Sequence, residues 1–150
     1  MNALMLLTTV IVCTSWVAHG GLLEFGIMIY RVTQRNPLIS YVAYGCHCGH
    51  NGRGAPKDEV DWCCHAHDCC FGRMNELGCR PKTQPYTYTY IDGNLTCTDP
   101  ENEKPDAACA RQICECDKEA ALCFKKNDGK YQRKYTFYIN LFCRGPKPQC

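Results

Sequence analysis

Apolar residues recur at helical spacing near the start of the chain. In residues 21–34 they follow an i, i+3, i+7 pattern along one face: Leu22, Phe25, Ile29 and Val32. This pattern predicts a short amphipathic helix, which Asn36 and Pro37 end. A single stripe is typical of core packing. Leu23 and Ile27 widen the apolar surface, which also suits contact with lipid, and the sequence leaves both interpretations open.

Two longer helices are predicted further along the chain. The first begins after Pro56, with Asp58 as its N-cap and Asp61 three residues on, and runs to Met74, ending near Gly78. The second covers residues 107–126, with Asp106 as its N-cap and residues 127–129 as its end.

Cysteines at i, i+7 spacing place the two long helices in register. Cys63 and Cys70 lie on one face of the first helix, and Cys116 and Cys123 on one face of the second. An antiparallel pair joined by Cys63–Cys123 and Cys70–Cys116 keeps one register, and this register brings Asp117 close to residues 67–71.

The segments between the helices have different patterns. Residues 44–54 hold four glycines and two cysteines, which favours a constrained loop. Tyr86 to Tyr90 alternates strictly, and Asp92-Gly93 leads as a hairpin turn into residues 94–97, a small two-stranded wing. Residues 98–104 predict an exposed loop, and residues 131–150 an aromatic, basic and irregular tail. We therefore expect a small, mainly α fold with one β-hairpin.

The first 20 residues have the features of a secretory signal. An apolar run from Leu4 to Val12 is too short to span a bilayer, and Ala18 and Gly20 are small residues at the positions that a signal peptidase reads. Cleavage after Gly20 would leave one domain, residues 21–150. We expect the protein to be secreted and extracellular.

Cysteine content supports the same compartment. The chain has 15 cysteines, and removal of Cys13 with the signal leaves 14. An even number in a short secreted chain predicts a disulfide framework. A zinc cluster at Cys63-Cys-His-Ala-His-Asp-Cys-Cys70 is the alternative, but an oxidising compartment removes the thiolates that zinc prefers.

The net charge gives little information about a binding partner. The net charge is +2, so a strongly basic surface for nucleic acid is not indicated. The charge is nevertheless uneven along the chain, because the C-terminal third is basic and the loop before residue 107 is acidic. Solvated surface charge is the simplest interpretation.

Residues 61–71 read DWCCHAHDCCF and carry the candidate chemistry. His67 becomes a competent general base if a buried carboxylate orients its ring, and Asp117 is placed to do so. Asp68, beside the glycine-rich loop, offers a carboxylate near several backbone carbonyls, which suits calcium. The motif offers no serine nucleophile and its cysteines are committed to bridges, so the sequence predicts direct attack by an activated water.

These motifs resemble the calcium loop and active-site helix of secreted phospholipase A2. The resemblance rests on YGCHCG at residues 44–49, GRG at 52–54, Pro56, the DxCCxxHDCC-like run at 61–70, and CECD at 114–117. It covers essentially the whole of residues 21–150. The extension to Cys150 resembles group II, and the DWCCHAHD run is most similar to its E and F subgroups.

The resemblance implies a role for each motif residue. His67 would deprotonate the water that attacks the sn-2 ester of a glycerophospholipid, with Asp117 orienting it and Tyr86 bonding that carboxylate. One calcium ion would be held by Asp68 and by the carbonyls of His47, Gly49 and Asn51, with the Gly49 N–H helping to stabilise the oxyanion. The remaining implied roles are an acyl channel at Leu22, Phe25 and Ile29 and a phosphate contact at Lys82.

The resemblance also implies a complete pairing of the 14 cysteines: Cys46–Cys143, Cys48–Cys64, Cys63–Cys123, Cys69–Cys150, Cys70–Cys116, Cys79–Cys109 and Cys97–Cys114. Two positions depart from the family pattern. Asn51 replaces a glycine whose carbonyl binds calcium, and Phe71 replaces a tyrosine that bonds the orienting aspartate. Asn94 begins an N-glycosylation sequon, Asn94-Leu95-Thr96.

The sequence thus predicts a calcium-dependent enzyme that acts at membrane interfaces and releases a fatty acid and a lysophospholipid. Its partner would be a phospholipid surface, and it would act as a monomer and without nucleic acid. The alternative is a ligand or toxin for a cell-surface receptor on the same scaffold, with weak catalysis. Retention of Asp68 together with His67 and Asp117 favours the enzyme.

Overall fold

The computed structural model describes residues 20–50, 52–99 and 106–150. The predicted signal, apart from Gly20, and the predicted calcium ligand Asn51 lie outside these residues. So does most of the predicted loop at residues 98–104. Within the described chain, no helix combines the length and the apolarity that a membrane span requires.

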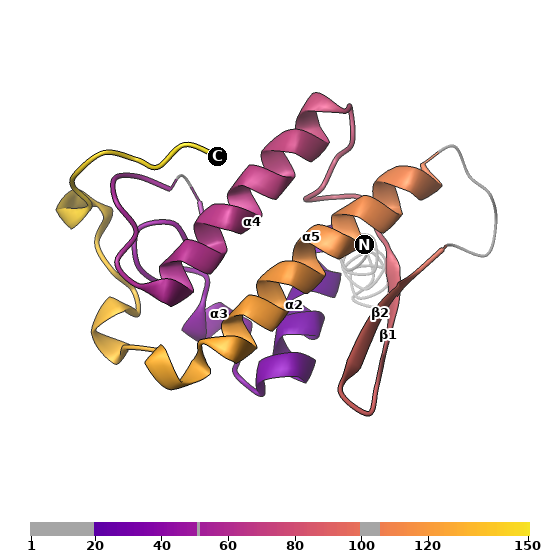
Figure 1. Cartoon of the computed structure of the whole chain (residues 1–150), viewed down its shortest axis with the longest axis horizontal. Coiled ribbons are helices and arrows are strands. Elements are labelled where there is room, and N and C mark those ends of the chain that lie inside the picture. The colour runs from indigo at the N-terminus through magenta and orange to yellow at the C-terminus, as the bar shows by residue number, and fades with distance from the viewer. Residues whose placement is uncertain (1–19, 51, 100–105) are drawn as a thin grey trace, which may run out of the picture.

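Two long antiparallel helices form the body of the molecule (Figure 1). Helix α4 spans Glu59–Glu76 and α5 spans Ala107–Lys126. Disulfides Cys63–Cys123 and Cys70–Cys116 join the two helices, so the predicted register is confirmed. Together with the hairpin, this arrangement confirms the predicted small, mainly α, disulfide-rich fold.

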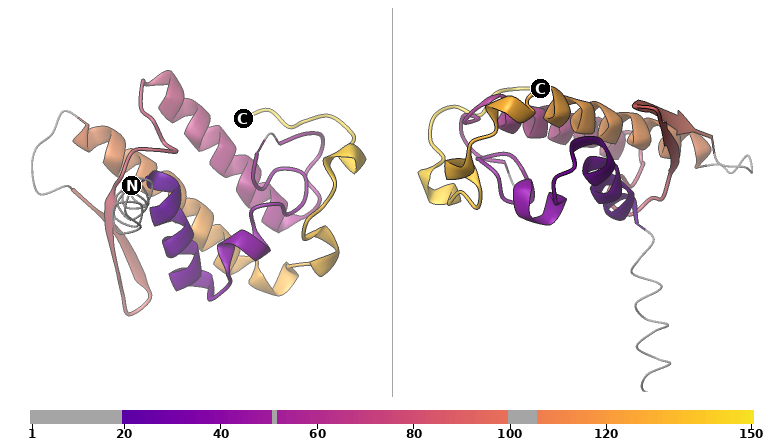
Figure 2. Two further views of the ribbon diagram at one scale, coloured as in Figure 1. Left: turned by 180° about the vertical axis from the view of Figure 1, so that it is seen from behind. Right: turned by 90° about the horizontal axis from the view of Figure 1, so that it is seen from below.

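The N-terminal helix α2, Gly21–Thr33, packs against α5 on one face of the layer that α4 and α5 form (Figures 1 and 2). The apolar residues of this helix fall into a buried group and an exposed group. Met28, Ile29 and Val32 are buried in the core, while Leu22 and Leu23 remain 52% and 44% exposed. Core packing is therefore confirmed for the buried part of the apolar surface, and contact with lipid stays a prediction for the exposed part.

One short helix was not predicted. Helix α3, Pro37–Ser40, follows α2 almost directly. The side chain of Asn36 accepts a hydrogen bond from the N–H of Leu38, and Pro37 occupies the first turn, where its missing N–H costs nothing. The Asn-Pro pair that ends one helix therefore also begins the next.

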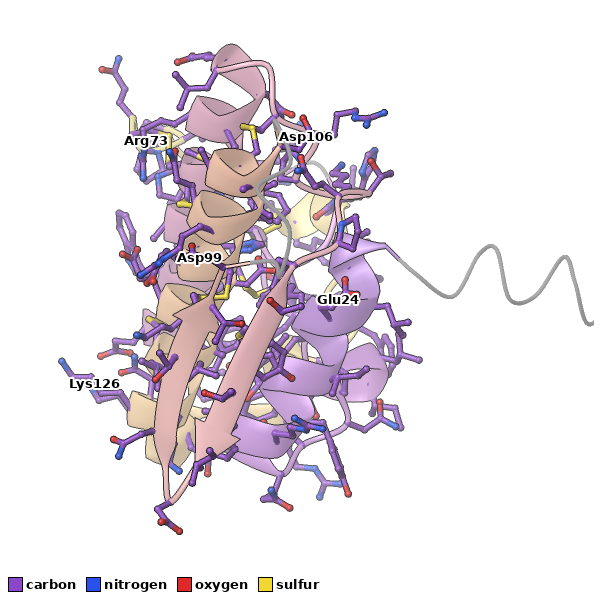
Figure 3. The ribbon with its side chains drawn as sticks, turned by 90° about the vertical axis from the view of Figure 1, so that its right-hand side faces the viewer. Glu24, Arg73, Asp99, Asp106 and Lys126 are labelled. Carbon is purple, nitrogen blue, oxygen red and sulfur yellow. A yellow bond between two sulfur atoms is a disulfide. The ribbon has the colours of Figure 1, made fainter. Side chains whose placement is uncertain are left out.

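The predicted wing is an antiparallel hairpin of β1, Thr87–Ile91, and β2, Asn94–Thr98. Asp92 and Gly93 between the strands both have positive φ, 50° and 79°, as a tight type I′ turn requires. Figure 3 shows the hairpin in front of α5, where Leu95 and Cys97 turn inward and Cys97 bonds Cys114.

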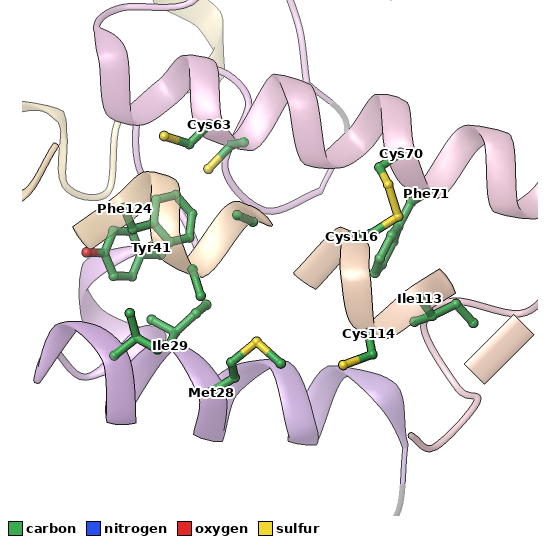
Figure 4. Close-up of a cluster of buried hydrophobic side chains, with 14 of the residues drawn as sticks. Met28, Ile29, Tyr41, Cys63, Cys70, Phe71, Ile113, Cys114, Cys116 and Phe124 are labelled. Atoms are coloured by element: carbon green, nitrogen blue, oxygen red, sulfur yellow. A yellow bond between two sulfur atoms is a disulfide. The ribbon is translucent and has the colours of Figure 1, made fainter. Parts of the chain in front are cut away.

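The core lies between α2, α4 and α5 (Figure 4). Met28, Ile113 and Phe124 are almost fully buried in it. A 3₁₀ turn, η1 at Asp128–Lys130, precedes the tail. The tail itself holds two more, η2 at Arg133–Tyr135 and η3 at Asn140–Phe142, so it is irregular as expected.

Seven disulfides fix these elements, and they are the same seven pairs that the resemblance implies. All four cysteines of residues 61–71 are bonded in this way. A zinc cluster at this motif is therefore excluded, because its sulfur atoms are not free thiolates.

Candidate active site

His67 and Asp117 meet between the two long helices. The Nε2 atom of His67 lies 2.6 Å from Oδ1 of Asp117, and the carboxylate is completely buried. Cys70 lies one turn beyond His67 on α4, and its bridge to Cys116 ends beside Asp117. The disulfide register thus holds the imidazole against the carboxylate.

Tyr86 supplies the second donor to this carboxylate. Its hydroxyl donates to Oδ2 of Asp117 over 2.6 Å, and the side chain is buried just before β1. Burial raises the pKa of Asp117, and the hydrogen bonds from His67 and Tyr86 act against that rise. Burial and the neighbouring Asp117 raise the pKa of Tyr86, so its hydroxyl stays protonated and remains a donor.

Two phenyl rings enclose the imidazole. Phe25 of α2 stacks on His67 with ring centroids 4.5 Å apart, and Phe71 of α4 lies on it at 4.1 Å. Because Nε2 is committed to Asp117, Nδ1 is the ring nitrogen left to take a proton. Phe71 has no hydroxyl group and packs against the ring of His67. The two carboxylate oxygens of Asp117 are instead bonded by His67 and Tyr86.

A pocket of about 400 Å³ opens in front of His67. Its walls include the predicted channel residues Leu22, Phe25 and Ile29, and also Lys82. The sequence did not indicate several other wall residues, all apolar: Gly26, Pro37, Leu38, Tyr41, Val42 and Phe124. Most of these come from α3 and the turn after it, so the unpredicted helix is what extends the channel.

The glycine-rich loop reaches the same pocket, which His47, Gly49 and His50 line together with Asp68. Gly49 has φ of 102°, and a Cβ there would overlap the carbonyl oxygen of Val42. Only glycine fits this position, so close backbone packing determines the path of the loop past Asp68.

Asp61 holds this loop in place. Its buried carboxylate accepts hydrogen bonds from the N–H groups of Cys46, His47 and Lys57, each over 2.8 Å. The sequence pattern suggested only that Asp61 belongs to the helix start. The helix is capped by Asp58, whose side chain accepts from the N–H of Asp61. No local signal reveals the role of Asp61, because its two partners in the glycine-rich loop, His47 and Cys46, are 14 and 15 residues earlier.

The loop residues His47 and Gly49 and the carboxylate of Asp68 fit a calcium ion. Among the described residues, no backbone N–H donates to the carbonyls of His47 and Gly49. The carboxylate of Asp68 faces the same pocket and has no hydrogen-bond partner within the described chain. Burial raises the pKa of Asp68, while His67 and His47 act against that rise. An oxygen-only set of one carboxylate and loop carbonyls is the donor chemistry that calcium prefers.

A base oriented by a buried carboxylate, beside an apolar channel and a loop whose carbonyls fit a cation, defines a class: a small, disulfide-bonded hydrolase for lipid esters. Comparison with known proteins agrees with this class. The sequence model of the phospholipase A2 family matches residues 22–136, and the chain belongs to this family.

The most similar relatives include secretory members of group II. Group IIE secretory phospholipase A2 from Mus musculus is 49% identical over 133 residues, 89% of each chain. Group IIF secretory phospholipase A2 from the same organism is 47% identical over 89% of this chain and 76% of its own. A membrane-associated phospholipase A2 from Rattus norvegicus is 44% identical over the whole of both chains. The resemblance to group II and to its E and F subgroups is confirmed.

Proposed function

We propose that this protein is a calcium-dependent phospholipase A2, which hydrolyses the sn-2 ester of glycerophospholipids at membrane surfaces. The observation that carries the proposal is the 2.6 Å contact between His67 and the buried Asp117 at the base of an apolar channel. The names of the group II relatives support the same activity. The receptor-ligand alternative is not favoured.

In the proposed reaction, Nδ1 of His67 removes a proton from a water molecule, whose oxygen attacks the ester carbonyl carbon. The resulting imidazolium is stabilised by Asp117, which Tyr86 keeps anionic. The tetrahedral intermediate collapses as His67 returns its proton to the departing glycerol oxygen. The products are a fatty acid and a lysophospholipid.

Calcium would be held by Asp68 and by the carbonyls of His47, Gly49 and Asn51. When bound, the ion would supply Lewis-acid polarisation of the ester and a counter-charge for the phosphate. The N–H of Gly49 would then support the oxyanion, and Lys82 at the pocket wall would contact the phosphate. Leu22, Phe25 and Ile29 would receive the acyl chain.

The lipid surface would meet the molecule around the mouth of this channel. Exposed apolar side chains on α2 and α3 surround it: Leu22, Leu23, Ile27, Tyr30, Leu38 and Ile39. Such a patch on a small protein is typical of a membrane or partner contact. We further propose that residues 1–20 direct secretion, that the protein acts as a monomer, and that Asn94 carries an N-linked glycan.

The direct test is hydrolysis of phospholipid vesicles by the mature protein with calcium and with a chelator. We expect fatty acid release that depends on calcium and stops on its removal. His67→Gln should abolish turnover while thermal unfolding stays within a few degrees of wild type. Activity that persists in chelator, or in His67→Gln, would contradict the proposal.

A further inference from the structure

One of the seven disulfides differs from the other six in exposure. Among the bonded cysteines of the described chain, Cys150 alone is an exposed residue, and the others are buried or half-buried. Its partner Cys69 lies on α4, and Figure 1 shows the C-terminal end of the chain beside that helix. Thiol–disulfide exchange requires access to a sulfur atom, and exposed bridges are the labile ones. The Cys69–Cys150 bridge is therefore the one that a thiol in solution reaches most easily.

A buried histidine lies against this bridge. The Nε2 atom of His65 is 3.7 Å from the sulfur of Cys69, because side chains at i and i+4 share a helix face. A ring nitrogen of His65 and both sulfur atoms of the bridge lie within 4.8 Å of one another. Two nearly perpendicular rings hold the imidazole, Trp62 with centroids 5.5 Å apart and His47 at 5.0 Å. Packing therefore fixes the orientation of His65 toward the sulfur.

No other contact in the described chain explains the polar atoms of His65. The residue is 5% exposed, and its buried Nδ1 atom has no hydrogen-bond partner among the described residues. Buried polar groups are nearly always hydrogen-bonded, and an exception calls for an explanation. His65 has no part in the proposed hydrolysis either, because His67 is the histidine that meets Asp117. The bridge is therefore the feature to which this side chain is directed.

A second bridge has a nearby N–H donor but lacks access. The side-chain amide of Asn127 lies 3.6 Å from the sulfur of Cys63 and 3.8 Å from that of Cys123. Neither of these cysteines is an exposed residue. Exposure and a side-chain N–H thus occur together at the Cys69–Cys150 bridge and at no other bridge of the described chain.

We propose that the Cys69–Cys150 bridge is a site of thiol–disulfide exchange with an external dithiol, in which His65 stabilises the departing sulfur. The sulfur of exposed Cys150 is attacked, and that of Cys69 is the leaving group. As the bond breaks, negative charge develops on Cys69, and the Nε2–H of His65 donates a hydrogen bond to it. A hydrogen bond to a charged group is stronger than one to a neutral group. This inference goes beyond the proposed hydrolysis and does not rest on it.

The exchange transfers two electrons from the dithiol to the bridge. A thiolate of the reagent bonds to the sulfur of Cys150, the Cys69–Cys150 bond breaks, and its electron pair stays on Cys69. The second sulfur of the reagent then bonds to the first, and its proton passes to the released Cys150. The reagent ends as a cyclic disulfide, and the protein ends with a Cys69 thiolate and a Cys150 thiol.

Opening this bridge leaves the active site held by other bonds. Helix α4 stays bonded through Cys64 and Cys70, which lie on both sides of residues 65–69. Cys143 also stays bonded, so the part of the tail that is released lies within residues 144–150. The exchange therefore frees the end of the tail without displacing the active-site histidine.

The first test is the order in which the bridges open. The folded mature protein is incubated with limiting dithiothreitol, samples are quenched in acid, and free thiols are alkylated and mapped by mass spectrometry. Cys69 and Cys150 should be labelled faster than any other pair, by about tenfold or more. Cys63–Cys123 is the internal control, because it has an N–H donor but no exposed cysteine. Faster opening of any other bridge would overturn the proposal.

Glutathione, a monothiol, shows which sulfur is attacked. It cannot form a cyclic disulfide, so the mixed disulfide persists long enough to be mapped. Glutathione should be attached to Cys150, and Cys69 should carry the free thiol. Attachment to Cys69 would overturn the assignment of the leaving sulfur.

Two variants test His65. His65→Phe keeps an aromatic ring beside Trp62 and removes the N–H, so opening by dithiothreitol should slow by about tenfold or more. His65→Gln keeps a side-chain N–H and should restore most of the wild-type rate. A loss of packing alone would speed opening, so slowing is a result that a merely structural role does not give. Opening of His65→Phe at or above the wild-type rate would overturn the role of His65.

Hydrolysis of a dispersed short-chain phosphatidylcholine separates this inference from the proposed function. Protein opened at Cys69–Cys150 should hydrolyse it as fast as the closed protein does. Loss of turnover on opening would overturn the claim that the exchange releases the tail alone. Failure of the closed wild type to hydrolyse this substrate would contradict the proposed function and leave the order of bridge opening as the measure of the exchange site.

Discussion

The buried carboxylate of Asp117 is the group on which the site depends most closely. It accepts one hydrogen bond from His67 and one from Tyr86, each over 2.6 Å. Burial raises its pKa, and the proposed reaction needs it ionised. Each donor therefore contributes to the pH range in which the His67–Asp117 pair can act.

Tyr86→Phe tests this dependence. Removing a donor to a charged group costs about 1.5–3 kcal/mol, and the loss of the tyrosine donor should raise the pKa of Asp117 further. The acid limb of the pH–rate profile, measured at saturating calcium, should therefore move to higher pH. A profile that keeps its acid limb would contradict this role for Tyr86.

The stability of this variant should depend on pH with a definite sign. A carboxyl whose folded pKa is raised favours folding below its unfolded pKa, and this contribution is lost as pH rises through the folded pKa. Protonated Asp117 needs the tyrosine donor less than the anion does. Urea unfolding should thus show a large loss for Tyr86→Phe at neutral pH and a smaller one in acid.

Asp61→Asn tests the loop that approaches Asp68. An amide cannot accept all three of the N–H bonds that Asp61 receives from Cys46, His47 and Lys57. We expect a loss of about 2–4 kcal/mol in the free energy of unfolding and at least tenfold weaker calcium binding by calorimetry. Asp58→Asn is the control, because asparagine also caps helices well. Equal effects of the two changes on calcium affinity would contradict a positioning role for Asp61.

Residue roles were predictable from sequence where a motif is local. His67, Asp68 and Gly49 stand in contiguous motifs, and the structure brings them to one pocket. Asp61 lies in the first turn of α4 as predicted, but its hold on the loop was missed, because Cys46 and His47 lie in a separate segment. Asp106 precedes α5 as expected, but its side chain makes no capping hydrogen bond. A capping pattern in sequence cannot tell whether the side chain turns toward the helix.

Among the elements, the α4–α5 pair positions the base and its carboxylate. The bounds of both helices were predicted closely, because an aspartate precedes each helix and a glycine follows each one. Residues 107–126 are helical as predicted. The first strand is shifted by one residue from the predicted alternation, and the second begins at Asn94 as predicted and ends one residue later. Helix α3 was missed since a four-residue helix shows no periodicity.

Removing the Cys70–Cys116 bridge with a pair of alanines tests the helix pair. The bridge spans 46 residues, and its loss should cost about 2–5 kcal/mol. Because it ends beside Asp117 and one turn from His67, the turnover number on dispersed substrate should also fall by at least tenfold. The alanine pair at Cys79–Cys109, which spans 30 residues at the other end of the helices, should be destabilised similarly and keep most of its turnover. Equal losses of turnover would contradict the argument.

At the scale of the whole molecule, the hairpin lies apart from the pocket that holds the candidate chemistry. The pocket is lined by residues from α2, α3, α4, α5 and the connecting loops, and by none from β1 or β2. The sequence could not predict this separation, because it depends on how α2 and the hairpin pack on α5. The separation of hairpin and pocket explains how a bulky group on the hairpin is compatible with catalysis at the pocket.

An N-linked glycan on Asn94 is therefore expected to leave turnover unchanged. Asn94 and Thr96, the two residues that define the acceptor sequon, both face outward on β2, while Leu95 between them is buried. Protein secreted from a eukaryotic cell should lose mass on treatment with peptide N-glycosidase F. Asn94→Gln should remove that shift and keep wild-type hydrolysis of dispersed and vesicular substrate. Secreted protein without a glycan would contradict the acceptor role, and a changed turnover number would contradict the separation of hairpin and pocket.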